Sequence, residues 1–286
     1  IRRLMSKCTK EDIENIFFEA SSIGIDQGRL DGLNIDHAII TNISRDHIDY
    51  HKNMNSYIEA KISLISGNHL KTIALNIDNE IINRRVKHLN PRNFVTVSNN
   101  NKNADIFFTL LNQDNDGLIN FRAETPWGKF EAKSKLMSKF NIYNLLLTLP
   151  YFQSIHNDCN KFFDAVPQLN LPKGRLDQVS NNIYVDYAHS PVALEEVCKN
   201  LQKKATGLAI VFGAGGDRDK GKRKLMGKVA DKYCKKVYIT NDNPRFEDPN
   251  EIIAMIQEGI LEKKKIYIEL NRSLAIKKAI NELNDD

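Results

Sequence analysis

The sequence predicts an α/β protein, and three observations support this class. Strand-like and helix-like stretches alternate regularly from about residue 182 to residue 283. Short apolar runs at 38–40 and 72–77 have the composition of buried strands and lead into polar loops. The polar motifs of the second half also follow predicted strands. We therefore expect mostly parallel sheets with ligands at the carboxyl ends of the strands.

Length and composition are those of a globular chain. The chain has 286 residues, enough for one large or two ordinary domains, with 41% hydrophobic and 27% charged residues. No apolar run approaches the roughly 20 residues of a membrane span, and the first residues do not resemble a signal peptide. We expect a cytoplasmic protein without membrane insertion.

Cysteines and charge exclude further classes. The four cysteines are far apart and form no CxxC motif, which predicts unpaired thiols in a reducing compartment; they are Cys8, Cys159, Cys198 and Cys234. The net charge of +5 comes from basic residues scattered among many acidic ones. Nucleic-acid binders more often show a basic stripe with interleaved aromatic residues, so no nucleic-acid partner is expected.

Two stretches near the start carry candidate metal ligands. Residues 15–18 have the composition of a short buried strand that delivers Glu19 to a sheet edge, where a carboxylate suits magnesium. A helix-capping glutamate is the alternative. Further on, the loop 41–51 is rich in Asp and His, which suits a hard cation, although a solvated surface loop is equally compatible. We expect Ser56 to cap the following helix, with Glu59 completing a capping box.

The middle of the chain predicts strands, hairpins and one long helix. We expect strands at 72–77 and 94–97, separated by a helix that starts at 78–80 and runs to about 89. The alternation over 104–135, with turns at 113–117 and 125–128, predicts hairpins. A helix begins near Asn141, and Pro150 is expected to kink or shorten it. Residues 171–175 have the composition of an interdomain linker, which predicts domains at 1–175 and 176–286.

The second domain is predicted to be a small, largely parallel, Rossmann-like sheet. Strands are expected near 182–187, 207–212, 236–240 and 265–270. Helices are expected near 191–204, 222–235, 249–262 and 273–283. The glycine-rich run at 213–216 is a weak phosphate signal by itself, because it lacks the dinucleotide-binding fingerprint.

Taken together, the motifs resemble the Mur ligase family. They occur in the family order and cover nearly the whole chain: EASSIGIDQGRL at 19–30, TNISRDHIDYH at 41–51 with Lys61, FNIYN at 140–144, GR at 174–175, DYAHSP at 186–191, GGDRDKGKR at 215–223 and DNPR at 242–245. The resemblance implies a central ATPase domain with a mostly parallel sheet over 1–175. It also implies a C-terminal amino-acid-binding domain over 176–286.

The resemblance further implies an ATP-dependent amide ligase of peptidoglycan synthesis. DNPR resembles the branch that adds meso-diaminopimelate to UDP-MurNAc-L-Ala-D-Glu through an acyl phosphate. The expected partners are small molecules, with ATP as substrate and Mg²⁺ as cofactor, and a monomer is expected. Three alternatives remain: a lysine-adding Mur ligase, a ligase like folylpolyglutamate synthetase, and a non-catalytic remnant of a ligase.

The resemblance assigns residues to the first domain's substrates. Glu19, His47 and a carbamylated Lys61 are the implied catalytic and Mg²⁺-binding residues. Carbamylation would give Lys61 the anionic oxygens that a hard metal prefers. Ordinary structural roles are the alternatives for Glu19 and His47. The implied residues for the UDP-muramoyl dipeptide are Ser21, Gln27 and Arg29, although Ile23 stands where the family commonly has His.

ATP and the incoming amino acid have implied residues as well. Those for ATP are Asn141, Asn144, Arg175, Asp186 and His189; a helix N-cap and a buried amide compete for the two asparagines. Those for diaminopimelate are Arg218, Asp242, Asn243 and Arg245. An arginine can hold the second carboxylate of diaminopimelate through two parallel hydrogen bonds, whereas lysine has no such carboxylate. A solvated surface arginine is the alternative for Arg245.

Two family motifs do not occur in the chain. No GxxGK[ST] phosphate loop is present, and the family's Gly-Lys-Gly-His-Glu loop would follow residue 286. We therefore expect a fragment that lacks both ends of its protein and does not catalyse the reaction alone.

Overall fold

The computed structural model describes residues 2–66, 70–89, 93–113, 118–205 and 207–283. The chain divides into two compact units. Unit 1 comprises Ile1–Ser44 and Tyr50–Leu171, and unit 2 comprises Arg45–Asp49 and Pro172–Asp286. Residues 45–49, which include the predicted metal ligand His47, are therefore part of unit 2.

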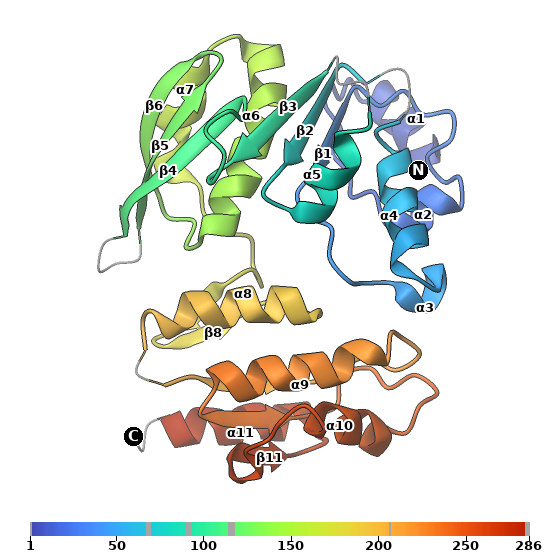
Figure 1. Cartoon of the computed structure of the whole chain (residues 1–286), viewed down its shortest axis with the longest axis vertical. Coiled ribbons are helices and arrows are strands. Elements are labelled where there is room, and N and C mark those ends of the chain that lie inside the picture. Colours follow the sequence, from blue (N-terminus) through green and yellow to red (C-terminus); the bar gives the residue numbers. More distant parts are fainter. Residues whose placement is uncertain (1, 67–69, 90–92, 114–117, 206, 284–286) are drawn as a thin grey trace. The chain divides into compact units, whose positions relative to one another are not determined.

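Unit 1 is built on a six-stranded sheet in the order β1-β2-β3-β4-β5-β6 (Figure 1). The strands are β1 (His37–Ile40), β2 (Thr72–Asn76), β3 (Phe94–Ser98), β4 (Ile106–Gln113), β5 (Ile119–Thr125) and β6 (Gly128–Ser134). The pairings from β1 to β4 are parallel, and the two pairings from β4 to β6 are antiparallel. In register, Leu75 lies opposite Ile40 on one side and Thr96 on the other. The mostly parallel sheet expected from the sequence is confirmed.

The alternating segment forms the predicted antiparallel hairpins. The β5–β6 turn is closed by Thr125, whose hydroxyl donates to the carbonyl of Gly128 at 3.0 Å and accepts from the amide of Trp127 at 3.1 Å. Residues 114–117, which make up most of the other predicted turn, lie outside the described residues.

Helices cover the sheet of unit 1. They are α1 (Arg2–Lys10), α2 (Ser22–Asp26), α4 (Met54–Ser63), α5 (Glu80–Val86), α6 (Lys139–His156), α7 (Cys159–Ala165) and the 3₁₀ turn η1 (Val166–Gln168); α3 (Ile48–His51) spans the boundary between the units. The core lies where α6 packs against the sheet. There Ile142 and Leu146 of α6 are completely buried, together with Phe108 and Phe121 of the hairpins.

The structure contradicts the expected cap of one helix and, of the kink or shortening expected at Pro150, the shortening. Helix α4 is capped by Asn53, whose side-chain oxygen accepts from the amide of Ser56 at 2.9 Å; Ser56 is not the cap. Asn53 has the extended backbone that a cap needs, and asparagine is among the best capping residues. Helix α6 is not shortened at Pro150 but continues to His156. Buried side chains on both sides of the proline hold it in place, which shows packing overriding local propensity.

The buried strand expected at 15–18 is absent. These residues adopt no regular structure, and Phe17 is 73% exposed. An apolar run forms a strand only when a neighbouring strand pairs with it, and β1 pairs with β2 alone among the described strands. The segment instead contacts α6: the hydroxyl of Tyr151 donates to Asn15 at 2.6 Å, and its ring lies edge-on to Phe17.

Unit 2 contains a parallel three-stranded sheet in the order β11-β10-β9. Its strands are β9 (Ala209–Phe212), β10 (Lys236–Ile239) and β11 (Ile266–Ile268). Its helices are α8 (Pro191–Gln202), α9 (Gly221–Tyr233), α10 (Pro249–Gln257), η2 (Lys263–Lys265) and α11 (Arg272–Leu283). The core joins Met226 of α9 and Ile256 of α10 to Val237 of β10. The predicted alternation of strands and helices is confirmed.

The fourth strand expected in this sheet lies elsewhere. Strand β8 (Ile183–Val185) pairs antiparallel with β7 (Asp177–Ser180), a strand that was not predicted, in a separate ribbon. Ser180 lies opposite Ile183, so a two-residue turn joins the strands. Asn182 occupies this turn with a positive φ of 58°, a conformation that asparagine tolerates well.

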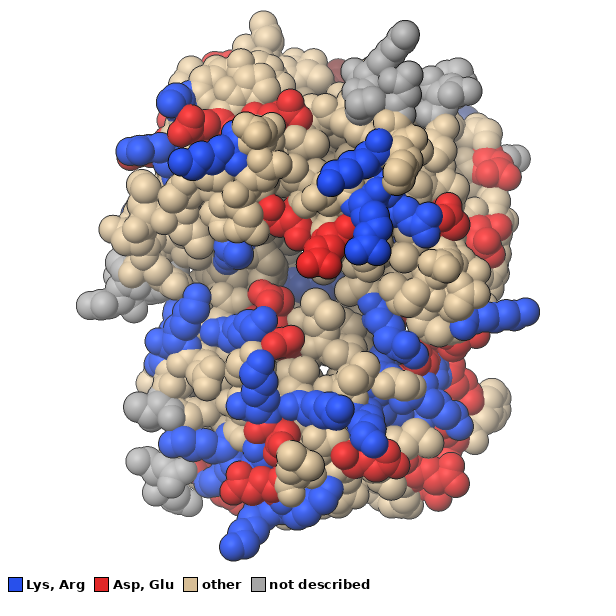
Figure 2. All heavy atoms as spheres, in the orientation of Figure 1, with Lys and Arg blue, Asp and Glu red and all other residues tan. Residues whose placement is uncertain are grey.

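In Figure 2, Lys and Arg side chains are interspersed with Asp and Glu on the visible face. Among the described helices, none combines the length and the apolar character that crossing a membrane requires.

Candidate functional site

In unit 2, two loops meet at the carboxyl ends of neighbouring strands. The loop after β9 contains Arg218, and the loop after β10 contains Asn243 and Arg245. The amide of Gly216 donates to the carbonyl of Asn243 at 2.8 Å, and Arg245 Nη1 donates to the carbonyl of Gly216 at 2.7 Å. The structure thus brings together the loops of three residues that the sequence assigned to the amino acid.

The contact between the loops requires glycine at position 216. A Cβ atom there would lie only 1.8 Å from the carbonyl oxygen of Pro244. Two residues near this contact, Asp217 and Arg245, adopt positive φ angles of 49° and 50°. Asp217 accepts a hydrogen bond from the amide of Phe246 at 3.2 Å, which adds a third hydrogen bond between the loops.

The guanidinium of Arg245 is only partly engaged. Its Nη1 bonds the carbonyl of Gly216 and lies 3.5 Å from that of Asn243. Among the described residues, none accepts a hydrogen bond from its Nε or Nη2. These two donors lie side by side on one edge of the guanidinium, and such an edge binds a carboxylate through two parallel hydrogen bonds.

Two other predicted amino-acid ligands, Arg218 and Asp242, form ionic contacts with charged neighbours within unit 2. Arg218 Nη1 lies 3.3 Å from a carboxylate oxygen of Asp49. Asp242 lies 4.0 Å from the guanidinium of Arg272, at the start of α11. Arg218 and Asp242 are therefore held by ionic contacts to elements outside their own loops.

A buried ion pair lies beneath the two loops. The guanidinium of Arg223, on α9, is completely buried and forms two 2.8 Å hydrogen bonds with the carboxylate of Glu247. Arg223 also donates to the carbonyl of Gly215 at 3.1 Å. The hydrogen bonds from Arg223 lower the pKa of Glu247 to about 2.

Residues 45–49 contribute further charges to unit 2. Arg45 makes a forked contact with Asp219, with Nε and Nη2 at 2.7 and 2.9 Å from its oxygens. Burial acts to raise the pKa of Asp219, but the hydrogen bonds and charge of Arg45, together with the amide of Gly221 and the charge of Lys222, outweigh it, and the net pKa is lowered. Asp219 follows Arg218 directly, so this contact fixes the end of the loop after β9.

Asp46 contacts two basic side chains, those of His189 and Lys222. Its carboxylate oxygens lie 3.2 Å from His189 Nε2 and 3.7 Å from the ammonium of Lys222, whose side chain is buried. The hydrogen bond with Asp46 raises the pKa of His189 despite the opposing effect of burial. His47, the next residue, has a positive φ of 52°, and its Nε2 lies 3.6 Å from Asp46.

The residues of unit 2 that were predicted to bind ATP lie around Tyr187. The guanidinium of Arg175 lies 4.7 Å from the centre of the exposed Tyr187 ring. His189 Nδ1 is 3.1 Å from the Tyr187 carbonyl oxygen. Asp186 accepts from the amides of Leu176 and Ala188 at 2.8 and 2.7 Å, which fixes the loop. The structure brings Arg175, Asp186 and His189 together.

In unit 1, the predicted residues of 19–30 lie at the surface. Glu19 is exposed. The hydroxyl of Ser21 caps α2 by accepting from the amide of Gly24 at 3.0 Å. Arg29 donates to the side chain of Gln27 at 2.5 Å, so these two residues are brought together.

The other predicted residues of unit 1 lie on helices. Lys61 is half-buried on α4, with its ammonium 5.6 Å from the centre of the Tyr57 ring. Asn144 is exposed on α6. Asn141 lies in the first turn of α6, which is capped by Ser138, and its buried Nδ2 has no hydrogen-bond partner among the described residues. A buried donor without a partner is a place where a ligand can bind.

Comparison with models of protein families shows which family the chain belongs to. Residues 1–150 match the Mur ligase middle domain, and residues 174–286 match the Mur ligase glutamate ligase domain. The chain belongs to the Mur ligase family. The family resemblance expected from the motifs is confirmed.

Two bacterial relatives of the chain are ligases of the same name. The chain is 34% identical over 270 residues to the UDP-N-acetylmuramoyl-L-alanyl-D-glutamate–2,6-diaminopimelate ligase of Ectopseudomonas mendocina, covering 93% of this chain and 55% of that one. It is 38% identical over 296 residues to the ligase of the same name from Rickettsia conorii, covering 100% and 60%. The chain therefore spans a little over half the length of these Mur ligases.

Solved structures agree with the family. A structure of UDP-N-acetylmuramoyl-L-alanyl-D-glutamate–2,6-diaminopimelate ligase matches with a TM-score of 0.56 and 36% identity, covering 91% of this chain and 55% of that chain. Folylpolyglutamate synthase of Mycobacterium tuberculosis, complexed with ADP and AMPPCP, has a TM-score of 0.69 at 17% identity, covering 89% and 58%. The second match shows a shared fold only.

The chemistry of the implied metal ligands can be compared with what a metal ion needs. Among the residues that the structure describes, no group of three or more His, Cys, Asp or Glu side chains is placed to hold a metal ion. Of the predicted set, Glu19 and His47 have donor atoms that suit a metal. Lys61 has an ammonium without a lone pair, so it fits this role only as a carbamate.

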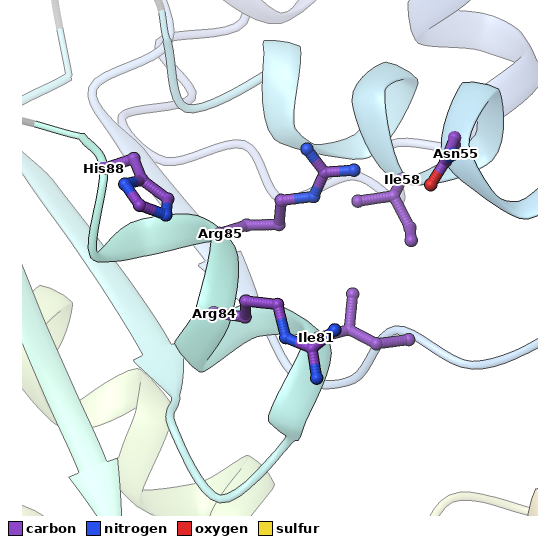
Figure 3. A pocket seen from close by; sticks show the side chains of 6 residues that line it. All are labelled: Asn55, Ile58, Ile81, Arg84, Arg85 and His88. Atoms are coloured by element: carbon purple, nitrogen blue, oxygen red, sulfur yellow. The ribbon is translucent and has the colours of Figure 1, made fainter.

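A separate pocket of about 220 Å³ lies between α4 and α5 of unit 1 (Figure 3). It is lined by Asn55, Ile58, Ile81, Arg84, Arg85 and His88. None of the predicted site residues of this Mur ligase lines it. Arg85 is paired with Glu59 of α4 at 2.6 Å.

Two functional candidates were missed at the sequence level. Arg223 and Glu247 join the loops, yet neither was among the predicted residues. The signal was present for Arg223: buried positions of α9 recur at 223, 226, 227 and 230, so the arginine occupies the stripe that faces the core. A charged residue on such a stripe requires a buried partner.

Proposed function

We propose that the protein containing this chain is an ATP-dependent amide ligase of peptidoglycan synthesis. It adds meso-diaminopimelate to UDP-MurNAc-L-Ala-D-Glu. The observation that carries this proposal is sequence identity of 34–38% to ligases of that name, extending over 93–100% of the chain. The loops of Arg218, Asn243 and Arg245, held together at the carboxyl ends of β9 and β10, support it.

The reaction has two chemical steps. ATP phosphorylates the γ-carboxylate of the D-glutamyl residue, which gives an acyl phosphate. The amine of diaminopimelate then attacks the acyl carbon, and inorganic phosphate leaves. The protein's contribution is mainly the positioning of the reactants and electrostatic stabilisation of the developing charge.

Arg245 is proposed to select the amino acid. Diaminopimelate has a second carboxylate that lysine lacks, and Arg245 has two adjacent donors without a partner among the described residues. Arg218, Asp242 and Asn243 would hold the remaining polar groups of the substrate. The desolvation of Arg245 would then be compensated only by diaminopimelate, because its second carboxylate provides the matching charge.

ATP is proposed to contact Asn141, Asn144, Arg175, Asp186 and His189. The unpaired buried amide of Asn141 supports its role. The clustering of Arg175 and His189 around Tyr187 supports theirs, since cationic side chains beside an aromatic ring suit a nucleotide.

The first domain is proposed to bind the other substrate and the metal. Ser21, Gln27 and Arg29 would contact the UDP-muramoyl dipeptide. Glu19, His47 and carbamylated Lys61 would hold Mg²⁺, which when bound neutralises charge on the phosphoryl groups. We further propose domains over 1–175 and 176–286, and a monomer that works in the cytoplasm, where ATP and UDP-linked precursors are made.

Phosphate release tests the function. The complete gene product containing this chain is incubated with ATP, Mg²⁺ and the UDP-muramoyl dipeptide, with meso-diaminopimelate or L-lysine added separately. Release with diaminopimelate alone is expected. Release with lysine alone would overturn the role of Arg245, and no release with either amino acid would overturn the ligase. Reactions without the dipeptide serve as the control for background ATP hydrolysis.

A further inference from the structure

The Arg223–Glu247 pair links three places that the proposed amino-acid site depends on. Arg223 belongs to α9, whereas Glu247 lies in the loop after β10, two residues beyond Arg245. The guanidinium of Arg223 also reaches the carbonyl of Gly215, in the loop after β9. One side chain therefore contacts both loops while it is anchored on a helix.

Glu247 extends the link from its own side. Its Oε1 accepts from the amide of Asp217 at 2.5 Å, directly before Arg218. Its Oε2 also lies 3.2 Å from the ammonium of Lys220. Only 10% of the Glu247 side chain is exposed, so these contacts are largely shielded from water. The residues on either side of Arg218 are thus tied to the loop that holds Asn243 and Arg245.

Fold stability alone does not explain this pair. A buried ion pair is often no more stabilising than well-packed apolar residues of similar size, because both charges lose their water. Arg223 carries an additional cost, since its buried Nε has no partner among the described residues. What an apolar replacement could not supply is the set of directional bonds that fixes the spacing of the loops.

We propose that Arg223 and Glu247 are positioning residues for the incoming amino acid. By fixing Gly215, Asp217 and their own backbones, they set the separation of Arg218 from Asn243 and Arg245. They touch no substrate themselves. The inference rests on the proposed function, because it assigns the purpose of the spacing to amino-acid binding.

A charge-balanced double variant separates positioning from stability. Arg223→Met leaves Glu247 unpaired, and it should both destabilise the protein and raise KM for meso-diaminopimelate by about tenfold or more. Adding Glu247→Leu removes the unpaired charge. The double variant should regain thermal stability but keep the raised KM. In both variants KM for ATP should change less than twofold.

A second buried ion pair in unit 2 provides the matched control. Lys265 lies 2.9 Å from Asp231, and its side chain is 8% exposed, but this pair contacts neither loop. Lys265→Met should lower the melting temperature and leave KM for meso-diaminopimelate unchanged. The inference is overturned if the double variant recovers the wild-type KM, or if Lys265→Met raises KM as much as Arg223→Met does.

Hydrogen exchange distinguishes failure of this inference from failure of the proposed function. Amides of residues 213–220 and 241–248 are followed in the wild-type protein, the double variant and Lys265→Met. Faster exchange of both loops in the double variant alone is expected, whichever amino acid is the substrate. If the wild type adds no diaminopimelate but the loops loosen as stated, the proposed function fails and the positioning survives. Unchanged exchange in the double variant refutes the positioning.

Discussion

The two regions that carry predicted substrate residues are built differently. In unit 2, the loops after β9 and β10 are held by the fully buried Arg223, by the nearly buried Asp219 and by a glycine contact. In unit 1, the predicted ligands of the segment 19–30 are exposed and make only local hydrogen bonds, such as that from Arg29 to Gln27. One region is ordered by the core beneath it, and the other by its own surface contacts.

The two regions should differ in how much side-chain entropy is lost when a ligand binds. A site whose side chains are already fixed loses little entropy when its ligand arrives, whereas surface side chains must be immobilised at that moment. We therefore expect substitutions in the unit 2 loops to affect folding and binding together. Substitutions of the exposed Gln27 and Arg29 should affect binding almost alone.

The largest expected effect is on the buried charge of unit 2. Glu247→Leu leaves the guanidinium of Arg223 buried without its partner, and should lower the free energy of unfolding by about 3–5 kcal/mol. Glu59→Leu is the matched control in unit 1, because the carboxylate of Glu59 is 61% exposed in its pair with Arg85. That change should cost less than about 1 kcal/mol. Urea denaturation measures both, and equal losses would remove the contrast.

Glycine positions give the next largest effect. Gly216→Ala would force the loops apart, and the expected loss is about 1–3 kcal/mol, as for other overpacked sites. Gly174→Ala meets no atom within 4 Å, but Gly174 has a positive φ of 73°. Its expected cost is about 1 kcal/mol, from backbone strain alone. Thermal unfolding measures the loss of stability in both variants. A greater loss at position 174 would show that the loops can move apart around a side chain at position 216 with little loss of stability.

The free energy of unfolding should depend on pH through the Arg223–Glu247 ion pair. The pKa of Glu247 is lowered from 4.5 to about 2, so its stabilisation is complete above the unfolded pKa and is lost as pH falls through the folded one. Between pH 5 and pH 3, the free energy of unfolding should fall more steeply for wild type than for Glu247→Gln. Parallel curves for wild type and Glu247→Gln would show that the lowered pKa has no stabilising consequence.

The smallest effect on stability is expected in unit 1. Arg29→Ala should change the free energy of unfolding by no more than about 0.5 kcal/mol, because both partners of its hydrogen bond are exposed. KM for the UDP-muramoyl dipeptide should nevertheless rise. Lys71→Ala, at an exposed pair with Asp36, serves as the control and should change neither quantity appreciably. A large loss of stability in Arg29→Ala would show that the surface contacts of segment 19–30 contribute substantially to the stability of the fold.

The sequence predicted the regular elements well where patterning and burial agree. Strands β2 and β3 and the β4–β6 hairpins follow from apolar runs and alternation that match their burial. Residues 15–18 have the same apolar character but lack a strand to pair with, and pairing is not encoded locally. The cap of α4 depends on where the chain turns, which favoured Asn53 over Ser56.

Contacts between distant residues were harder to predict. The motifs marked the loops of Arg218 and Arg245, but not the side chains that join them. Arg223 and Glu247 are 24 residues apart, and only the folded sheet places them together. Likewise, β8 has a strand composition suitable for either sheet, and its partner β7 decided the outcome.

The tight contact at Gly216 has a consequence for changing amino-acid specificity. Because Gly216 meets Pro244 directly, and Arg223 grips Glu247, neither loop is an independent module. Transplanting residues 241–248 from a ligase with another preference would bring a backbone that the resident 213–223 was not shaped to meet. Specificity in this fold is expected to be exchanged, by evolution or by an engineer, only as a matched pair of loops.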